Sequence, residues 1–367
     1  MLEREELAPL ILCTVSAHLA REGLMVKRGM DWKQENLNHP RRSPMNQAKL
    51  VSLAIATLTA LGPACALGQA WPARPVRIIV PFPPAGGVDT LTRTFGQKLS
   101  EQIGVNVLVE NRPGAGGTIG ADAVARAPAD GYTLFVSAPE FAINAVIREK
   151  PPYDALKDFT HISLIGAGTF ILASHPSVPA KTVKDVIALA RVRPGQLTYG
   201  SSGAGGINHL SGELLQIMTG IRWIHVPFKG SAPSTAALMS GDIDFVFGSA
   251  SSMINSIRSG RIKPIGITGT KRYEELPEVP TLAESGVPGY EVLGWYGFYG
   301  PAGMQPQTLK RLHAETVRAL STPEVKEKLS RIGVDVIAST PEEFTTFLRN
   351  EMAKWSKVVK QAKLKAE

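Results

Sequence analysis

Four segments rich in glycine, proline and serine are the part of this chain best suited to chemistry. Each follows a stretch typical of a β-strand and precedes a stretch typical of a helix. Glycine lets the backbone approach a ligand closely, and the first turn of a helix offers free N–H groups to an anion. The segments are Phe82–Asp89 (FPPAGGVD), Asn111–Gly120 (NRPGAGGTIG), Ser201–His209 (SSGAGGINH) and Phe228–Pro233 (FKGSAP).

The candidate binding residues come from these segments and from two other positions, Ser137 and Asp244. One such segment alone is more often a tight strand-to-helix turn, but four together favour an anion site at the carboxyl ends of parallel strands. Asp89, His209 and Asp244 also fit structural roles in first helical turns or a solvated turn. The predicted ligand-binding residues are Phe82, Ala85, Gly86, Gly87, Asp89, Gly116, Gly117, Ser137, Ser201, Ser202, Gly203, His209, Lys229, Gly230 and Asp244.

The motifs of nucleotide-binding and metal-dependent enzymes are incomplete here. Ile119 occupies the last glycine position of a dinucleotide-binding pattern, and the phosphate-loop pattern G-x-x-x-x-G-K-[ST] does not occur. The histidines after residue 70 lack metal-ligand spacing. We therefore expect no metal, no cofactor and no enzymatic activity.

One enzymatic alternative remains from the residues. Gly200–Ala204 approaches the G-x-S-x-G nucleophile elbow, with Ser202 at its centre and Ala204 in place of the last glycine. His225 and His313 lie downstream as possible bases. A periplasmic serine hydrolase using Ser202 is therefore the rival hypothesis.

Strand-like and helix-like stretches alternate after residue 70. Val76–Phe82 is apolar and β-branched, and Val88–Ile103 then places Leu91, Phe95 and Leu99 at helical spacing. This β-α-β-α order predicts an α/β fold with mostly parallel sheets flanked by helices. Further strands are predicted at 105–111, 132–138, 197–200, 223–228, 243–247 and 262–268, with helices at 119–127, 207–218 and 234–240.

Three threonines mark helix starts. Thr182 precedes Asp185 and Thr340 precedes Glu343, and both pairs have the spacing of a capping box. Thr322 precedes Pro323, which suits the first helical position. We expect each threonine to cap its helix.

The first 70 residues differ from the rest of the chain. An apolar run at 50–61 follows Lys49, and small residues lead to Ala70, as in a cleavable secretory signal peptide. The run is shorter than the roughly 20 residues of a membrane anchor. We interpret 45–70 as the signal peptide, with a buried helix as the alternative. Residues 1–44 precede Met45 and are either an upstream start artefact or an unusually long leader.

Composition excludes several classes of protein. The chain has 367 residues, enough for two domains with separate cores. Removing the leader's eight basic and six acidic residues from the chain's 40 and 32 leaves a net charge of +6. This charge is diffuse, so we expect no nucleic-acid binding and modest steering of anionic solutes. Cys13 and Cys65 both lie in the leader, so no disulfide is expected in the exported chain.

Eight segments between Trp71 and about Lys360 form a distinctive series: RPVRIIVPFPPAGGVD, ENRPGAGGTIGADAVARAPADGYTL, PPYDALKDF, PGQLTYGSSGAGGINHLSGELL, HVPFKGSAPSTAALMSGDIDFVF, LPEVPTLAESGVPGYEV, GWYGFYGPAGM and TPEEFTTFLRNEM. In their order and spacing they resemble the Bug family, the TctC-like solute-binding proteins of tripartite tricarboxylate transporters.

The resemblance implies a two-lobed periplasmic solute-binding fold with a ligand cleft between lobes. It implies one lobe from 71–172 plus 295–367 and a second from 173–294. It further implies that a small carboxylate, an organic acid or amino acid, is held by backbone groups, hydroxyls and bridging waters rather than by an arginine clamp. We expect the protein to be a monomer. Its partners would be the membrane subunits of a tripartite transporter, although a sensor for a membrane receptor would share the fold.

Three positions depart from the family pattern. Ala85 stands where glycine is usual, and Gly248 replaces a common aspartate. After Asn144, Ala145 and Ile147 replace the usual proline and tyrosine. We expect the last two departures to alter ligand choice or lobe closure.

Overall fold

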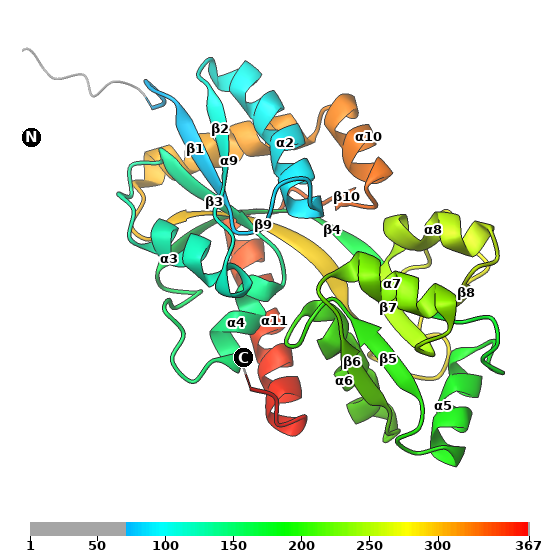
Figure 1. The fold of residues 1–367 in the computed structure, drawn as a ribbon. Coiled ribbons are helices and arrows are strands. Elements are labelled where there is room, and N and C mark those ends of the chain that lie inside the picture. The colour runs from blue at the N-terminus through cyan, green and yellow to red at the C-terminus, as the bar shows by residue number, and fades with distance from the viewer. Residues whose placement is uncertain (1–70, 366–367) are drawn as a thin grey trace, which may run out of the picture. The chain divides into compact units, whose positions relative to one another are not determined.

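One ten-stranded sheet runs through residues 71–365, the part of the chain that the computed structural model describes (Figure 1). The predicted leader, residues 1–70, lies outside the described residues. The strand order is β2-β1-β3-β9-β4-β7-β5-β6, and β8 and β10 also pair with β4. The strands are β1 (Val76–Val80), β2 (Val107–Asn111), β3 (Thr133–Ser137), β4 (Phe159–Ser174), β5 (Thr198–Ser201), β6 (Ile224–Pro227), β7 (Phe245–Ser249), β8 (Lys263–Ile267), β9 (Leu293–Pro301) and β10 (Asp335–Val336).

Strand β4 is shared by the two halves of this sheet. Its residues 159–169 pair antiparallel with β9, and residues 170–174 pair antiparallel with β7 and β8. Outside this centre the ladders β2-β1-β3 and β7-β5-β6 are parallel. Each half therefore contains a parallel ladder of three strands, as predicted. The pairings among β3, β9, β4, β7, β8 and β10 are all antiparallel, so the sheet as a whole is mixed rather than mostly parallel.

Helices cover both faces of each half, as the alternating pattern predicts (Figure 1). In the first half, Ile78 packs with α2, α9 and α10, while the adjacent Ile79 packs with α3, α4 and α11. In the second half, Leu172 faces α5 and α6, while Ile171 faces α7 and α8. The helices are α2 (Gly87–Ile103), α3 (Thr118–Ala125), α4 (Glu140–Ile147), α5 (Val183–Val192), α6 (Ile207–Thr219), α7 (Ser231–Ser240), α8 (Ala250–Arg258), α9 (Pro306–Leu320), α10 (Pro323–Arg331) and α11 (Pro341–Gln361), with a 3-10 turn η1 at Ala115–Gly117.

Two of the three predicted helix caps are confirmed. Thr182 with Asp185, and Thr340 with Glu343, each make both hydrogen bonds of a capping box. Pro323 does begin α10, but the Thr322 side chain does not cap it. The Thr322 hydroxyl instead donates to the carbonyl of Ala319 in the preceding helix.

Helix α4 is absent from the sequence prediction. Six of its eight residues are apolar, because it is buried on several sides and shows no polar face. It also follows β3 through Pro139 rather than through a glycine-rich segment. Among the described residues, no helix is both long and apolar enough to cross a bilayer.

A buried carboxylate joins β9 to α11. Glu351 accepts a hydrogen bond from the indole N–H of Trp295 and another from that of Trp355, each at 3.0 Å. Both indoles are fully buried, and Glu351 is 7% exposed. Lys354 forms an ion pair with the same carboxylate. The carboxylate thus satisfies two donors that would otherwise lie unpaired in the core.

We predict that Glu351→Ala lowers the free energy of unfolding by roughly 2–5 kcal/mol, because two buried N–H donors lose their acceptor. Glu351→Gln keeps an acceptor oxygen and should lose less. Urea denaturation followed by tryptophan fluorescence measures both. The exposed neighbour Asn350→Ala is the control and should change stability by less than about 0.5 kcal/mol. Equal losses for Glu351→Ala and Asn350→Ala would contradict the structural role of this carboxylate.

Candidate functional site

A cavity of about 580 Å³ lies where loops from both halves of the sheet face each other. All four predicted segments contribute to its lining. Because each follows the carboxyl end of a strand, neighbouring strands bring them to one edge. The lining from these segments is Phe82 and Pro83, Ala115 and Gly116, Ser202–Gly206, and Gly230.

The lining includes five of the predicted binding residues: Phe82, Gly116, Ser202, Gly203 and Gly230. The other ten predicted residues do not line this cavity. They support the lining loops, lie beside them at the surface, or lie elsewhere. They are Ala85, Gly86, Gly87, Asp89, Gly117, Ser137, Ser201, His209, Lys229 and Asp244.

Asp89 shapes the loop after β1 rather than facing the cavity. Its buried carboxylate accepts hydrogen bonds from the backbone N–H of Ala85, from Arg93 and from Asn111. Burial by itself would raise the pKa of Asp89, but these hydrogen bonds outweigh it and lower that pKa. Asp89 is therefore held as an anion by its own loop.

Ala85 has a φ of +64°, in the left-handed region where glycine is favoured. This conformation accounts for the glycine usual at that position, and it is strained for alanine. Gly87 is the first residue of α2 and does not have such a φ. A Cβ at Gly87 would lie 3.4 Å from the Tyr296 hydroxyl, an ordinary contact. Backbone conformation therefore does not require glycine at 87.

The loop after β2 is held by two side chains from α4. Residues 114–117 all have positive φ, which turns two of their carbonyl groups toward α4. The carbonyl of Gly116 accepts from Asn144 Nδ2 at 2.7 Å, and that of Ala115 accepts from Arg148 Nη2 at 3.2 Å. A Cβ on Gly117 would meet Pro81 at 3.2 Å, so that glycine serves the turn.

Helix α4 supplies the cavity's charged side chains, which the sequence prediction missed. It adds Glu140, Asn144, Ile147 and, just past its end, Arg148 to the lining. Burial raises the pKa of Glu140, while the backbone N–H groups of Glu140 itself and Ile207 oppose that shift. Arg148 Nε is buried without a hydrogen-bond partner in the described structure. In the sequence, the departure from the family pattern after Asn144 was the one signal that this segment contributes to the site.

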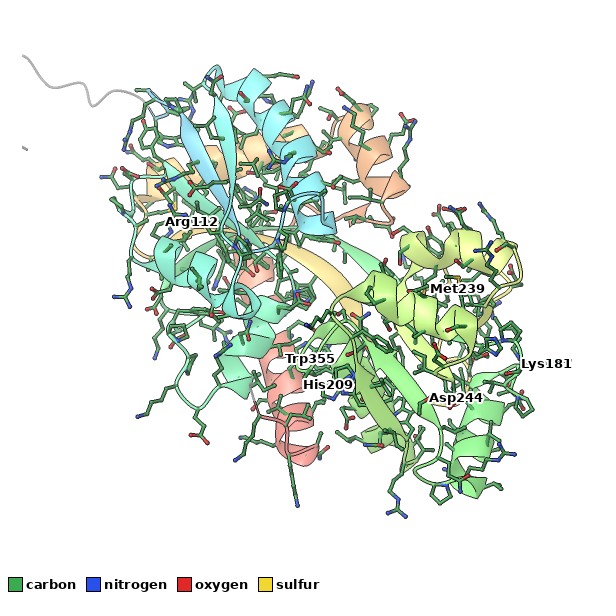
Figure 2. The ribbon with its side chains drawn as sticks, in the orientation of Figure 1. Arg112, Lys181, His209, Met239, Asp244 and Trp355 are labelled. Atoms are coloured by element: carbon green, nitrogen blue, oxygen red, sulfur yellow. The ribbon has the colours of Figure 1, made fainter. Side chains whose placement is uncertain are left out.

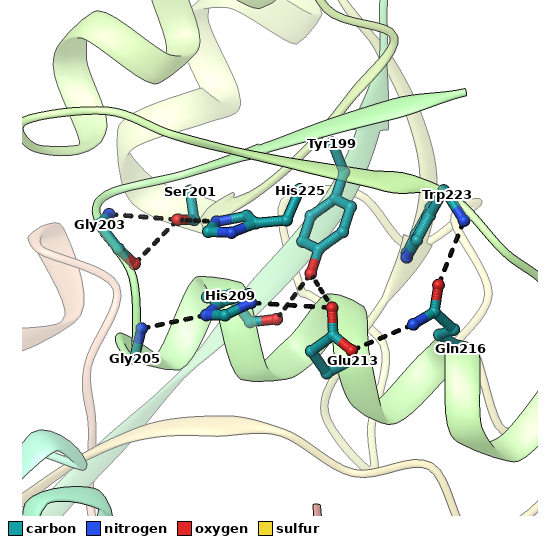
Figure 3. Close-up of polar contacts among 9 residues, drawn as sticks. All are labelled: Tyr199, Ser201, Gly203, Gly205, His209, Glu213, Gln216, Trp223 and His225. Carbon is teal, nitrogen blue, oxygen red and sulfur yellow. Dashed lines mark hydrogen bonds and ion pairs between the residues drawn. The ribbon is translucent and has the colours of Figure 1, made fainter. Parts of the chain in front are cut away.

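The loop after β5 rests on a polar network beneath the cavity (Figure 3). His209 does not point into the cavity, which corrects the prediction for it. Its Nδ1 accepts from the Gly205 N–H at 3.0 Å, and its Nε2 lies 3.7 Å from Glu213 Oε1. Glu213 Oε1 also accepts from the Tyr199 hydroxyl at 2.6 Å. His209 therefore positions the glycine loop from below.

Ser201 is also a loop-supporting residue (Figure 3). Its fully buried hydroxyl donates to the Gly203 carbonyl at 2.9 Å and accepts from the Gly203 N–H at 3.1 Å. Its remaining contact is with His225 Nε2 at 2.6 Å. The His225 ring stacks on His209 with centroids 3.7 Å apart. Ser201 is thus fully used in holding the turn at Gly203.

Asp244 lies at the opposite end of β5 from the cavity, which corrects the prediction for it. Its carboxylate accepts from the backbone N–H and the hydroxyl of Thr198, at 2.8 and 2.9 Å. Figure 2 shows it well apart from His209. Lys229 is exposed beside the fourth loop, and Ser137 is buried at the end of β3, paired with Gly297. None of the three lines the cavity.

Comparison with known proteins identifies the family. The family model described as "Tripartite tricarboxylate transporter family receptor" matches residues 91–364. The chain belongs to this receptor family. It is similar to an R. palustris protein solved with adipate, at 35% identity and a TM-score of 0.71 over 80% of this chain and 99% of that one. It is also similar to the periplasmic binding protein BugD, at 28% identity and a TM-score of 0.69 over 81% and 100%. MatC from Rhodopseudomonas palustris, solved with malate, is 29% identical with a TM-score of 0.69, over 79% of this chain and 100% of that one.

The receptor is a two-lobed solute-binding protein and not an enzyme. The serine hydrolase hypothesis is therefore wrong, and the geometry gives the reason. His225 contacts Ser201 rather than Ser202, and Ser201 is fully buried. His313 bonds to the Ser339 carbonyl in the other half of the sheet. No histidine is placed to activate Ser202 in the described structure.

Because His209 is buried and His225 is partly buried where the two rings stack, we predict that the stability of the receptor depends on pH. Burial lowers the pKa of His225 to about 4, with the charge of His209 as a further cause. The unfolded chain therefore takes up this proton first, near pH 6.5. The contribution of His225 to the free energy of unfolding is therefore fully present above pH 6.5 and is lost as the pH falls toward 4. For one titrating group, the free energy of unfolding changes by at most about 1.4 kcal/mol per pH unit, and by less where solvent screens the charge.

Urea denaturation between pH 7 and pH 4 measures this slope. We expect His225→Gln to flatten it relative to the wild type. Asn350→Ala is the control, because it changes an exposed side chain that has no contact with either ring, so its slope should match the wild type. A His225→Gln variant with the full wild-type slope would show that another group carries the effect.

Proposed function

We propose that this receptor captures a small carboxylate, an organic acid or an amino acid, and delivers it to the membrane subunits of a tripartite transporter. The observation that carries the proposal is the cavity itself, where four strand-end loops and Arg148 converge. Related receptors have been solved with adipate and with malate, which are both carboxylates. The protein would act as a monomer.

The lining has the groups that a carboxylate needs. Arg148 has five N–H donors, of which Nη2 bonds to Ala115 and Nε has no partner in the described structure. Ser202 and the glycines at 203–206 offer a hydroxyl and accessible backbone. Micromolar binding corresponds to about 8 kcal/mol, and a few charge-assisted hydrogen bonds supply energy of that order after desolvation.

Capture would proceed by closure of two lobes, 71–172 plus 295–367 against 173–294. The chain passes between these lobes near 170–174 and 293–298, and β4 changes pairing partners at Phe170. Ile143 and Ile147 of α4 are buried with Leu210 of α6, so the cavity walls are already in contact. A solute that binds both walls favours this closed arrangement.

The function is tested by thermal-shift screening of the purified protein against a carboxylate library, since a ligand specific for the folded state raises its melting temperature. With the best ligand, we expect Arg148→Ala to weaken affinity at least tenfold by calorimetry, or about 1.4 kcal/mol. Lys229→Ala is the matched control: it removes an equal charge outside the lining and should change affinity less than twofold. Failure of every carboxylate to shift the folded protein would overturn the proposed function.

Export is part of this proposal. Residues 45–70 would act as a signal peptide that is cleaved after Ala70, and 1–44 would be absent from the mature protein. Mass spectrometry of the periplasmic fraction should therefore give an N-terminus close to Trp71. A stable cytoplasmic form that retains residues 1–70 would contradict this prediction.

A further inference from the structure

The N-termini of two helices meet across the cavity at one side chain of the protein. Glu140 is the first residue of α4, and Ile207 is the first residue of α6 on the opposite wall. The backbone N–H groups of Glu140 itself and of Ile207 both act to lower the pKa of the Glu140 carboxyl group, against the larger effect of burial. Both helix ends therefore point their positive dipoles at the same carboxyl group. Glu140 and the loop residues beside Ile207 line the same cavity.

This arrangement places a carboxylate of the protein where the loops would otherwise receive a carboxylate of the solute. A second anion there would be repelled by the ionised form of Glu140. None of the ion pairs in the described structure involves Glu140. Burial raises the pKa of Glu140, and a cation beside it would favour the ionised form, which has acceptor positions for about four hydrogen bonds. Those free positions call for a donor, preferably a cationic one.

The other end of α4 presents the opposite chemistry. Arg148 follows the helix eight residues after Glu140, which corresponds to about 12 Å along its axis. Its guanidinium keeps donors free, as described above, and both residues line one cavity. Neither forms an ion pair with the other in the described structure. The cavity therefore has one acidic and one basic recognition point at separate places.

We propose that Glu140 is a specificity-determining residue that selects solutes with a positively charged amino group at the end opposite their carboxylate. This inference rests on the proposed function, and it narrows the solute to an amino-carboxylate rather than a dicarboxylate. The carboxylate of the solute pairs with Arg148, and its ammonium group donates to Glu140. A dicarboxylate of the same length places its second charge against Glu140 and is rejected.

The test compares probes of equal length that differ at one end. The pairs are succinate with 4-aminobutanoate, glutarate with 5-aminopentanoate, and adipate with 6-aminohexanoate. Calorimetry with the protein purified from the periplasm should show at least a tenfold preference for the amino member of the pair that fits best. Glu140→Gln removes the charge with little change in shape, and should reduce that preference at least tenfold. Glu149→Gln, an exposed neighbour with the same change of charge, should keep the wild-type preference.

The outcomes separate this inference from the proposed function. If dicarboxylates bind the wild type more tightly and Glu140→Gln leaves the ratio unchanged, Glu140 does not select the solute, although carboxylate capture stands. If Glu140→Gln lowers the affinity for both probes of a pair equally, Glu140 only helps to close the cavity. That result would also overturn the inference. If carboxylates of every kind fail to bind the folded wild type, the proposed function fails and the inference fails with it. Thermal melting of each variant confirms that it is folded.

Discussion

The antiparallel ladder between β4 and β9 fixes the position of every loop at the cavity. On one side of it β3, β1 and β2 follow in order, and on the other β7, β5 and β6 follow. The cavity loops come after β1, β2, β5 and β6, and α4 comes after β3. Each loop is therefore placed by a chain of strand pairings that begins at this ladder. The pairing shifts register twice along it, which allows the long β4 to bend while its hydrogen bonds continue.

The sequence predicted the loops well because their chemistry is local. Glycine, proline and serine after an apolar run specify a strand-to-helix turn, and parallel strands bring such turns together. The individual contacts were predicted less well. Ser201 and His209 have groups that a ligand would use, but a strand-to-helix loop near the core must first satisfy its own N–H and carbonyl groups. Which hydroxyl or imidazole meets the backbone depends on coordinates that spacing alone does not determine.

Helix α4 shows the other limit of prediction from sequence. Its residues are apolar because it packs against α11 and α6 as well as the sheet, so its pattern lacks the polar face of a surface helix. The two charged residues that matter, Glu140 and Arg148, lie at its ends, where charges are common on any helix. Their importance arises because the first end of α4 faces the first end of α6, and that relation is a property of the folded chain.

Helix α11 has a consequence for how tightly a solute is held. Its first half, with Phe344 and Leu348, packs with β9, and its second half, with Trp355 and Val358, packs in the core formed with α6. If the cavity walls separate, the apolar contact between α11 and the core formed with α6 must therefore shift or break, although it lies away from the solute. Apparent affinity scales with the fraction of molecules already in the binding-competent state. Substitutions in the packing of α11 can thus change the apparent affinity of this receptor for its solute, while the residues that contact the solute stay the same.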